Sequence, residues 1–475
     1  MIKKLTLLGC LILSTSLLAQ FKTLQKKDTN GYSYEIVEND PSNTRIYTLP
    51  NGLKVYLAQN KDEPRIQTYI PVRTGSNNDP TDNTGLAHYL EHMLFKGTSK
   101  MGSHDWEKEK VYLKQISDLY EAHKAESNPE KKSEIYRQID SISNVASQYA
   151  VANEYDKLIS SLGATGTNAH TWFDETVYKN NIPSNELEKW MIIESERFSE
   201  LVLRLFHTEL EAVYEEFNRA QDNDFRLIHY ALMENLFPES HYGTQTTIGT
   251  SEHLKNPSLV AIEKYFDEYY IPNNMAVVLV GDLEFDAAIQ LVDKYFGHFQ
   301  KGPEPNRYVA QESPLRGIKE LEVFSPSAER LQFAFRVGGA RTQDAKLLRI
   351  MDMILSNRTA GLIDLNINQK QLAQYAGASP QIMKDYSAHI FNGMPRQGQS
   401  LDEVRDLILE QIEKIKKGDF DEWMIEAVIN DFKKQQQQVL ENSDWLASEM
   451  YNSFIQEQTW AEVVADLDEL SKITK

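Results

Sequence analysis

The sequence predicts an α+β protein with two related domains, each a largely antiparallel sheet with helices packed on one face, and a helical-hairpin insertion. Strand-like alternation is followed by helical spacing of apolar residues, and this order recurs after a linker, as in a degenerate duplication. A long charged segment interrupts the first of the two patterns. The chain has 475 residues, which is too long for a single core.

Residues 1–19 are typical of a secretory signal peptide. The basic start Met1-Ile-Lys-Lys precedes an apolar stretch from Leu5 to Leu18, which is too short to span a bilayer comfortably. We expect cleavage after Ala19 and a periplasmic or secreted protein; the alternative is an N-terminal membrane anchor. The only cysteine, Cys10, lies in this stretch, so a transition-metal site in the mature chain must use histidine and carboxylate ligands.

The formal net charge of the chain is −20. This acidity argues against nucleic acid as a partner, and against anionic membrane surfaces beyond the export step.

The first domain is expected over residues 40–300. An Asn-Gly turn between two alternating runs predicts a hairpin at 48–55. Residues 85–96 have helical spacing of apolar side chains. The helix is expected to begin after a polar turn that offers three capping side chains, Asp82, Asn83 and Thr84.

The charged segment at about 104–158 has helical spacing on both sides of Ser127-Asn-Pro129. It predicts an amphipathic helical hairpin that projects from the domain and either shapes the neighbouring cavity or only decorates the surface. Strands are expected near Gly166 and Thr176, followed by helices at about 186–204 and 208–220.

A linker is expected at 301–315 and a second, homologous domain at 316–475. The second domain has His389 as its only histidine, so we expect it to be inactive. It also ends before the last helix and strand that close the first domain, so we expect it to be truncated at its C-terminus.

The residues with the clearest chemistry are His88, Glu91 and His92, an H-x-x-E-H motif within the helix predicted at 85–96. Histidines four residues apart share a helix face and can bind one ion. Glu91 lies at the edge of that face, where a carboxylate can take a proton from water that a metal has acidified. The motif therefore predicts metal-assisted hydrolysis of a carbonyl compound.

Zinc requires a third protein ligand and an open position. The helix at 208–220 offers four carboxylates at spacings that pair Glu209 with Glu216 and Glu211 with Glu215. Spacing alone does not choose between the pairs, and His207 and His170 are further candidates.

The run Thr84-Gly-Leu-Ala-His-Tyr-Leu-Glu-His-Met-Leu-Phe-Lys-Gly-Thr98 resembles the inverted zinc motif of the pitrilysin/insulinase family of metallopeptidases, in the N-terminal half of its members. Other segments share this resemblance: Thr48-Leu-Pro-Asn-Gly-Leu53, Gly75-Ser76, Gly166-Thr-Asn-Ala169, Tyr242-Gly243, Ile248-Gly-Thr250, Tyr270-Ile-Pro-Asn-Asn-Met275 and Gly281-Asp282. The gap between His92 and Glu216 is longer than is usual in the family, and the predicted hairpin accounts for the excess.

The resemblance implies one Zn²⁺ per chain, held by His88, His92 and Glu216, with Glu91 as the general base. It also implies that Glu209 supports the metal site from the outer shell. In the family, the positions of Asn168 and Ala169 belong to a strand edge that pairs with the substrate backbone.

The function implied is that of a zinc metalloendopeptidase acting on peptides or small unfolded proteins. In the family two such halves close around the substrate. We therefore expect a partner half, which is a C-terminal half, another subunit or a second copy of the chain. The alternative function is a non-catalytic subunit that binds peptides or supports the assembly of a two-half peptidase.

Overall fold

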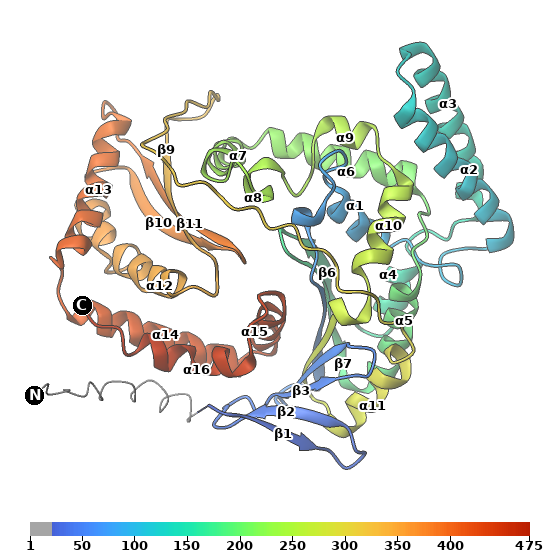
Figure 1. Ribbon diagram of the computed structural model, residues 1–475, viewed down its shortest axis with the longest axis horizontal. Coiled ribbons are helices and arrows are strands. Elements are labelled where there is room, and N and C mark those ends of the chain that lie inside the picture. The colour runs from blue at the N-terminus through green and yellow to red at the C-terminus, as the bar shows by residue number, and fades with distance from the viewer. Residues whose placement is uncertain (1–20) are drawn as a thin grey trace, which may run out of the picture.

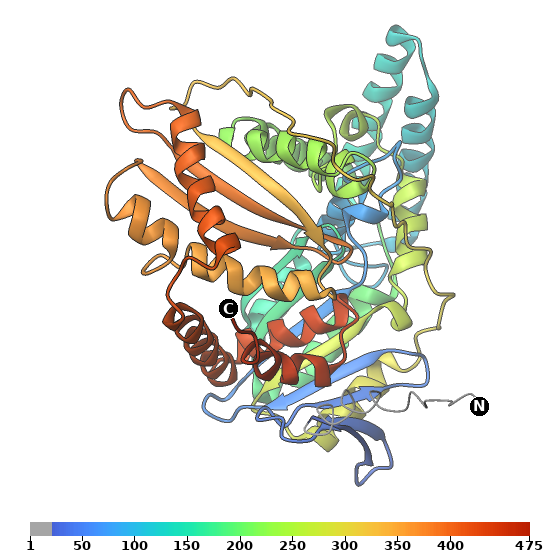
Figure 2. The ribbon, with the colours of Figure 1, turned by 60° about the vertical axis from the view of Figure 1, so that its left-hand side comes forward.

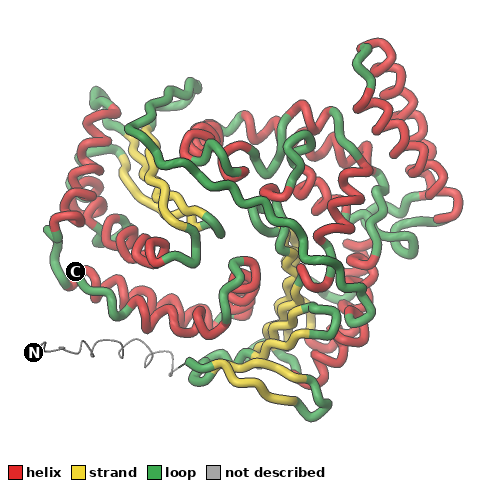
Figure 3. The backbone as a smooth tube through the Cα atoms, viewed as in Figure 1, coloured by secondary structure: helices red, strands yellow, loops and turns green. Residues whose placement is uncertain are grey.

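The computed structural model describes residues 21–475, so the predicted signal peptide lies outside the described residues. Two groups of strands, each with its own helices, are joined by an extended segment, and two long helices project from the first group (Figure 1). Figure 3 shows the strands gathered in these two places. The predicted α+β fold with two domains and a helical-hairpin insertion is confirmed.

The first domain contains an eight-stranded sheet in the order β1-β2-β3-β4-β8-β5-β7-β6. All neighbours are antiparallel except β4 and β8, which run parallel. Every residue of β8 is buried, which explains why this strand is continuously apolar rather than alternating. The strands are β1 (Thr23–Lys27), β2 (Ser33–Val37), β3 (Arg45–Thr48), β4 (Lys54–Gln59), β5 (Arg65–Val72), β6 (Thr165–Thr171), β7 (Thr176–Pro183) and β8 (Ala276–Gly281).

Helices of the first domain bury their apolar stripes against one face of this sheet, with Leu90, Met93, Trp190 and Ile289 in the shared core. The helices are α1 (Leu86–Met93), α2 (Trp106–Ala125), α3 (Pro129–Ala146), α4 (Glu154–Ser161), α5 (Leu187–Ser199), α6 (Phe206–Gln221), α7 (Asp224–Leu236), α8 (His241–Thr244), α9 (Ser251–Lys255), α10 (Leu259–Tyr269) and α11 (Phe285–Phe296).

The projecting helices α2 and α3 form the predicted hairpin (Figure 1). One side of the hairpin packs on the domain, because Ile116, Tyr120 and Ile139 are almost fully buried in the main core. Near the start of α2, Glu109 and Arg204 form a buried ion pair, with Nε and Oε1 2.7 Å apart. The hairpin is therefore anchored in the domain along one side.

The second domain has a three-stranded antiparallel sheet in the order β10-β11-β9. This order repeats β6-β7-β5 of the first sheet, and α12 follows β9 as α1 follows β5. Among the described residues, 297–330 contain no helix or strand, so the irregular segment is longer than the predicted linker. The elements are β9 (Leu331–Gly338), α12 (Gln343–Leu355), β10 (Tyr375–Ile382), β11 (Tyr386–Met394), α13 (Leu401–Lys417), α14 (Trp423–Glu441), α15 (Ser443–Ile455) and α16 (Trp460–Leu470).

Helix α15 returns to the first domain and packs on the face of its sheet that the other helices leave open (Figures 1 and 2). Met450 and Phe454 join Tyr69 and Val278 in one apolar cluster, and all four side chains are buried. No sequence pattern predicts this contact. No helix in the described part of the chain combines the length and the apolar character needed to cross a membrane.

Candidate metal centre and active site

Helix α1, which carries the H-x-x-E-H motif, begins at Leu86, and its first N–H groups are capped by Asp79, which lies outside the helix. The carboxylate of Asp79 accepts hydrogen bonds from the backbone N–H groups of Gly85 (2.8 Å) and Ala87 (2.9 Å). Gly85 adopts the left-handed conformation, with φ of 83°, which a glycine tolerates without strain.

The prediction that Asp82, Asn83 or Thr84 caps this helix is wrong, because the N-cap residue is Gly85 and no side-chain cap comes from it. The chain makes one more turn before the helix starts. The hydroxyl of Thr84 instead lies 2.7 Å from Nδ1 of His253.

The structure brings His88, His92 and Glu216 together from α1 and α6. The Nε2 atoms of the two histidines are 3.3 Å apart. Oε2 of Glu216 lies 3.6 Å from Nε2 of His88 and 3.8 Å from Nε2 of His92. Among the described residues this is the one group of three or more such side chains whose ligand atoms converge within 4.8 Å.

Glu209 and Lys96 form an ionic chain behind His92. Oε1 of Glu209 lies 2.9 Å from Nδ1 of His92, and its Oε2 lies 2.5 Å from Nζ of Lys96. Burial acts to raise the pKa of Glu209, but its hydrogen bonds to His92 and Lys96 outweigh it and hold the pKa below its usual value. An ionised Glu209 accepts a hydrogen bond from the Nδ1–H group of His92, and the lone pair of Nε2 is then free to bind a metal ion.

The two histidines have different electrostatic environments. Burial lowers the pKa of His88 to about 4, and the neighbouring His92 adds to this effect. Burial also acts to lower the pKa of His92, but the hydrogen bond with Glu209 and the charge of Glu216 raise it above its usual value. His88 is therefore neutral near pH 7, as a metal ligand must be.

Glu91 is buried beside this group, with 8% of its surface exposed. Burial raises its pKa, although a hydrogen bond from Thr171 acts in the opposite direction. The hydroxyl of Thr171 donates to Oε2 of Glu91 over 2.6 Å. A carboxylate with a raised pKa that is held in place can accept and return a proton near neutral pH.

The predicted binding residues Asn168 and Ala169 lie on β6, the last strand of the sheet. One side of β6 pairs with β7, and on its other side no strand of the described residues 21–475 pairs with its backbone groups. The motif residues, β6 and helices α6 and α7 line one cavity of about 1180 Å³. Its size and its open strand edge suit an extended peptide.

The remaining ligand candidates are not members of the converging group found among the described residues. Nδ1 of His207 lies 2.7 Å from the hydroxyl of Tyr120, and Nε2 of His170 lies 3.0 Å from Oε1 of Glu175. Glu211 and Glu215 are exposed on α6. Sequence reasoning missed three residues that support the site, Lys96, Thr171 and Asp79, because each acts through a contact between separate elements.

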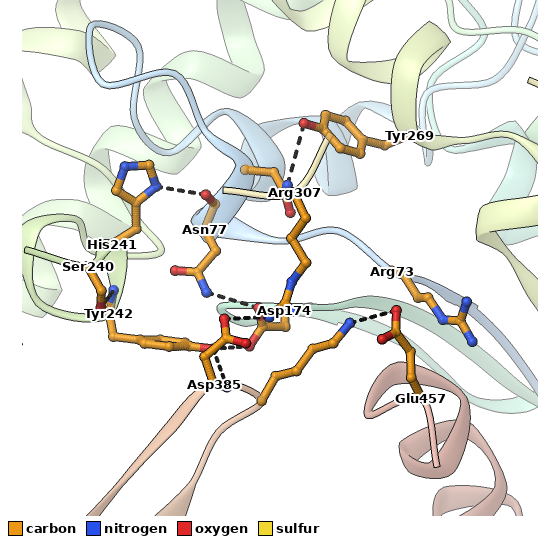
Figure 4. Close-up of polar contacts among 12 residues, drawn as sticks. Arg73, Asn77, Asp174, Ser240, His241, Tyr242, Tyr269, Arg307, Asp385 and Glu457 are labelled. Carbon is orange, nitrogen blue, oxygen red and sulfur yellow. Dashed lines mark hydrogen bonds and ion pairs between the residues drawn. The ribbon is translucent and has the colours of Figure 1, made fainter. Parts of the chain in front are cut away.

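A polar cluster lies where the turn after β6 meets the second domain (Figure 4). Asp174 accepts hydrogen bonds from Asn77 (2.9 Å) and from the hydroxyl of Tyr242 (2.7 Å). Arg307, in the segment between the domains, pairs with Asp385 at 2.6 Å and reaches Asp174 at 3.5 Å. The turn that follows the open strand edge is thus tied to both domains.

Two family models match this chain. Residues 54–113, which contain the H-x-x-E-H helix, match the model described as insulinase (peptidase family M16), and residues 258–432 match the model described as peptidase M16 inactive domain.

The chain belongs to the insulinase family, peptidase family M16. The family resemblance inferred from the sequence motifs is confirmed. The second match begins at residue 258, within the first domain, and continues into the second domain.

Individual M16 proteins are similar over most of the chain. Zinc protease PqqE of Helicobacter pylori is 23% identical, over 78% of this chain and 74% of its own length. A solved H. pylori protease matches with a TM-score of 0.71 and 20% identity, over 91% of this chain and 94% of that one. The periplasmic protease PqqL of Escherichia coli matches with a TM-score of 0.64 and 17% identity, over 92% of this chain but 45% of that one.

The chain spans about half the length of several other curated relatives that it matches. Several of these relatives are named zinc proteases, which supports zinc protease activity as a property of the family.

Proposed function

We propose that this chain is a zinc-dependent endopeptidase that hydrolyses peptides or small unfolded proteins. The observation that carries the proposal is the convergence of His88, His92 and Glu216 within 4.8 Å. Glu91 lies beside them in a cavity bounded by an open strand edge.

The donor set fits zinc. Two imidazole nitrogens and one carboxylate are a common ligand set for catalytic zinc, which leaves a fourth position open. Two ligands about 2.0–2.1 Å from a tetrahedral ion are about 3.3 Å apart. The two Nε2 atoms are separated by 3.3 Å, and the Glu216 oxygen lies 3.6 and 3.8 Å from them. Glu209 completes the arrangement by orienting His92.

When bound, zinc would acidify a water molecule and polarise the scissile carbonyl group. Glu91 takes a proton from the attacking water while the oxygen of that water bonds to the carbonyl carbon. Glu91 then gives the proton to the amine nitrogen as the C–N bond breaks, so the carboxylate is regenerated.

The substrate would bind as an extended strand antiparallel or parallel to β6, with Asn168 and Ala169 supplying backbone hydrogen bonds. Such pairing is independent of side-chain sequence, which suits an enzyme for unfolded peptides. A second half, either a partner subunit, a C-terminal half or another copy of the chain, would close the cavity. Two solved relatives, the periplasmic protease PqqL of Escherichia coli and the first half of that protease, support this arrangement and a periplasmic or secreted location.

The proposal is tested by zinc content and peptide hydrolysis, measured on the chain alone and with a candidate partner half. We expect about one zinc per chain and activity that a chelator abolishes. His88→Ala should lose the zinc, and Glu91→Gln should keep it and lose at least about 10²-fold in kcat. His104→Ala, which changes an exposed histidine, is the control.

Two outcomes would contradict the proposal. Wild-type turnover by Glu91→Gln would overturn the role of this residue. Stable peptide binding without hydrolysis, with or without zinc and a partner, would favour the non-catalytic subunit instead.

A further inference from the structure

Thr171 joins the strand edge and the general base of the proposed site. It is the last residue of β6, and its hydroxyl donates to Oε2 of Glu91 over 2.6 Å. This is a short hydrogen bond to a carboxylate, of the kind that is stronger than one between neutral groups. It connects two elements that are about 80 residues apart in the sequence.

The surroundings of Thr171 direct its single hydroxyl proton toward Glu91. The other neighbouring acceptor, Oγ1 of Thr176, is 3.5 Å away, well beyond the distance of a good O–H···O bond. Thr176 in turn donates its own proton to the carbonyl oxygen of Thr74 over 2.9 Å. With Oε2 held in this way, the second oxygen of Glu91 remains to accept a proton from water.

The position of Thr171 in β6 matters as much as its hydroxyl. Its register partner on β7 is Thr176, and Ala169, two residues earlier, points its side chain to the same face of the strand. In the described part of the chain, β6 has a neighbouring strand on one side only, and a register shift between Thr165 and Asn168 marks an irregularity in that pairing. A peptide that pairs with the open side would restrain the whole of β6, including Thr171, whose hydroxyl donates to Glu91.

We propose that Thr171 is a positioning residue that fixes Glu91 and couples its orientation to substrate pairing along β6. The inference rests on the proposed function, since it gives Glu91 the role of general base. Thr171 acts on the reaction through the carboxylate of Glu91, to which its hydroxyl donates. Longer peptides pair with more of β6, so we expect them to be hydrolysed with a higher kcat as well as a lower KM.

The experiment compares Thr171→Val with Thr171→Ser. Valine keeps the branched shape of threonine and removes the hydroxyl, whereas serine keeps the hydroxyl. For Thr171→Val we expect unchanged zinc affinity, a KM within about twofold, and a kcat about 10²-fold lower, as for a misplaced reacting group. Thr171→Ser should recover most of the kcat. The gain in kcat with peptide length should be present in the wild type and absent in Thr171→Val.

A general structural role would not produce this pattern, because serine would then restore little and zinc affinity would fall with kcat. Wild-type kcat in Thr171→Val, or no recovery in Thr171→Ser, would overturn the proposal. If the wild type hydrolyses no peptide, the proposed function fails, and crystal structures of the zinc-loaded wild type and Thr171→Val still decide the coupling. An unchanged Glu91 side-chain conformation in Thr171→Val would then refute it.

Discussion

At the scale of single residues, the site depends on which partner each carboxylate has. Glu91, Glu209 and Glu216 lie close together in an acidic protein, but each is stabilised differently. Glu209 is held between His92 and Lys96, Glu91 accepts from Thr171, and Glu216 faces the two histidines. These contacts offset the repulsion among the three carboxylates near one cavity.

The ionic chain behind His92 leads to a prediction about zinc affinity. Glu209→Ala removes the acceptor for Nδ1 of His92 and leaves Lys96 without its partner. We expect zinc to bind about 10–100-fold more weakly, as for other residues that orient a metal ligand. Competition with a chromophoric chelator measures this change. Glu211→Ala, on the exposed side of the same helix, is the control and should bind zinc as the wild type does.

At the scale of elements, helix α1 is placed by contacts that come from outside it. Asp79 holds its first turn, and the loop after it is held by Arg204, which donates to the carbonyl oxygens of Lys96, Thr98 and Met101. Arg204 is also the partner of Glu109 at the base of the α2–α3 hairpin. The insertion thus supports the helix that carries the motif.

Loss of the cap should destabilise the protein. Asp79→Ala leaves the buried N–H groups of Gly85 and Ala87 without an acceptor, so we expect the free energy of unfolding to fall by about 2–3 kcal/mol. Chemical denaturation monitored by tryptophan fluorescence would measure it. Asp82→Ala should change stability by less than about 0.5 kcal/mol, because this aspartate is exposed. Equal effects of the two changes would contradict the assignment of the cap.

At the scale of the whole molecule, the two domains share a core and a polar cluster. Helix α15 places Met450 and Phe454 on the first sheet. The guanidinium of Arg73, the residue after β5, stacks on the ring of Phe454, with its Cζ 3.8 Å from the ring centroid. The Arg307 contacts with Asp174 and Asp385 add a polar connection (Figure 4). We therefore expect the domains to unfold together.

The shared core can be tested by cutting back one side chain. Phe454 is 1% exposed, so Phe454→Ala should lower the free energy of unfolding by about 3–5 kcal/mol. Calorimetry should show one transition in the wild type, shifted to lower temperature in the variant. Trp445→Ala, on the same helix but 48% exposed, should have a much smaller effect. Two separate wild-type transitions would show that the domains are not coupled.

The sequence by itself determined the fold class, the family, the hairpin insertion and the helix with His88, Glu91 and His92. The helix and the hairpin depend on spacing within one segment, which reflects the helical period directly. The fold class and the family depend on patterns and short motifs that recur along the chain, each of which is local in sequence. The spacing in the sequence did not identify the third ligand, because several carboxylates and histidines were possible. The family resemblance then favoured Glu216.

Only the tertiary structure decided which carboxylate lies beside the histidines, and that Thr171, Lys96 and Asp79 support them. It also decided that α15 covers the first sheet. These contacts join segments separated by long stretches of chain, and no local pattern specifies which surfaces meet when the chain folds.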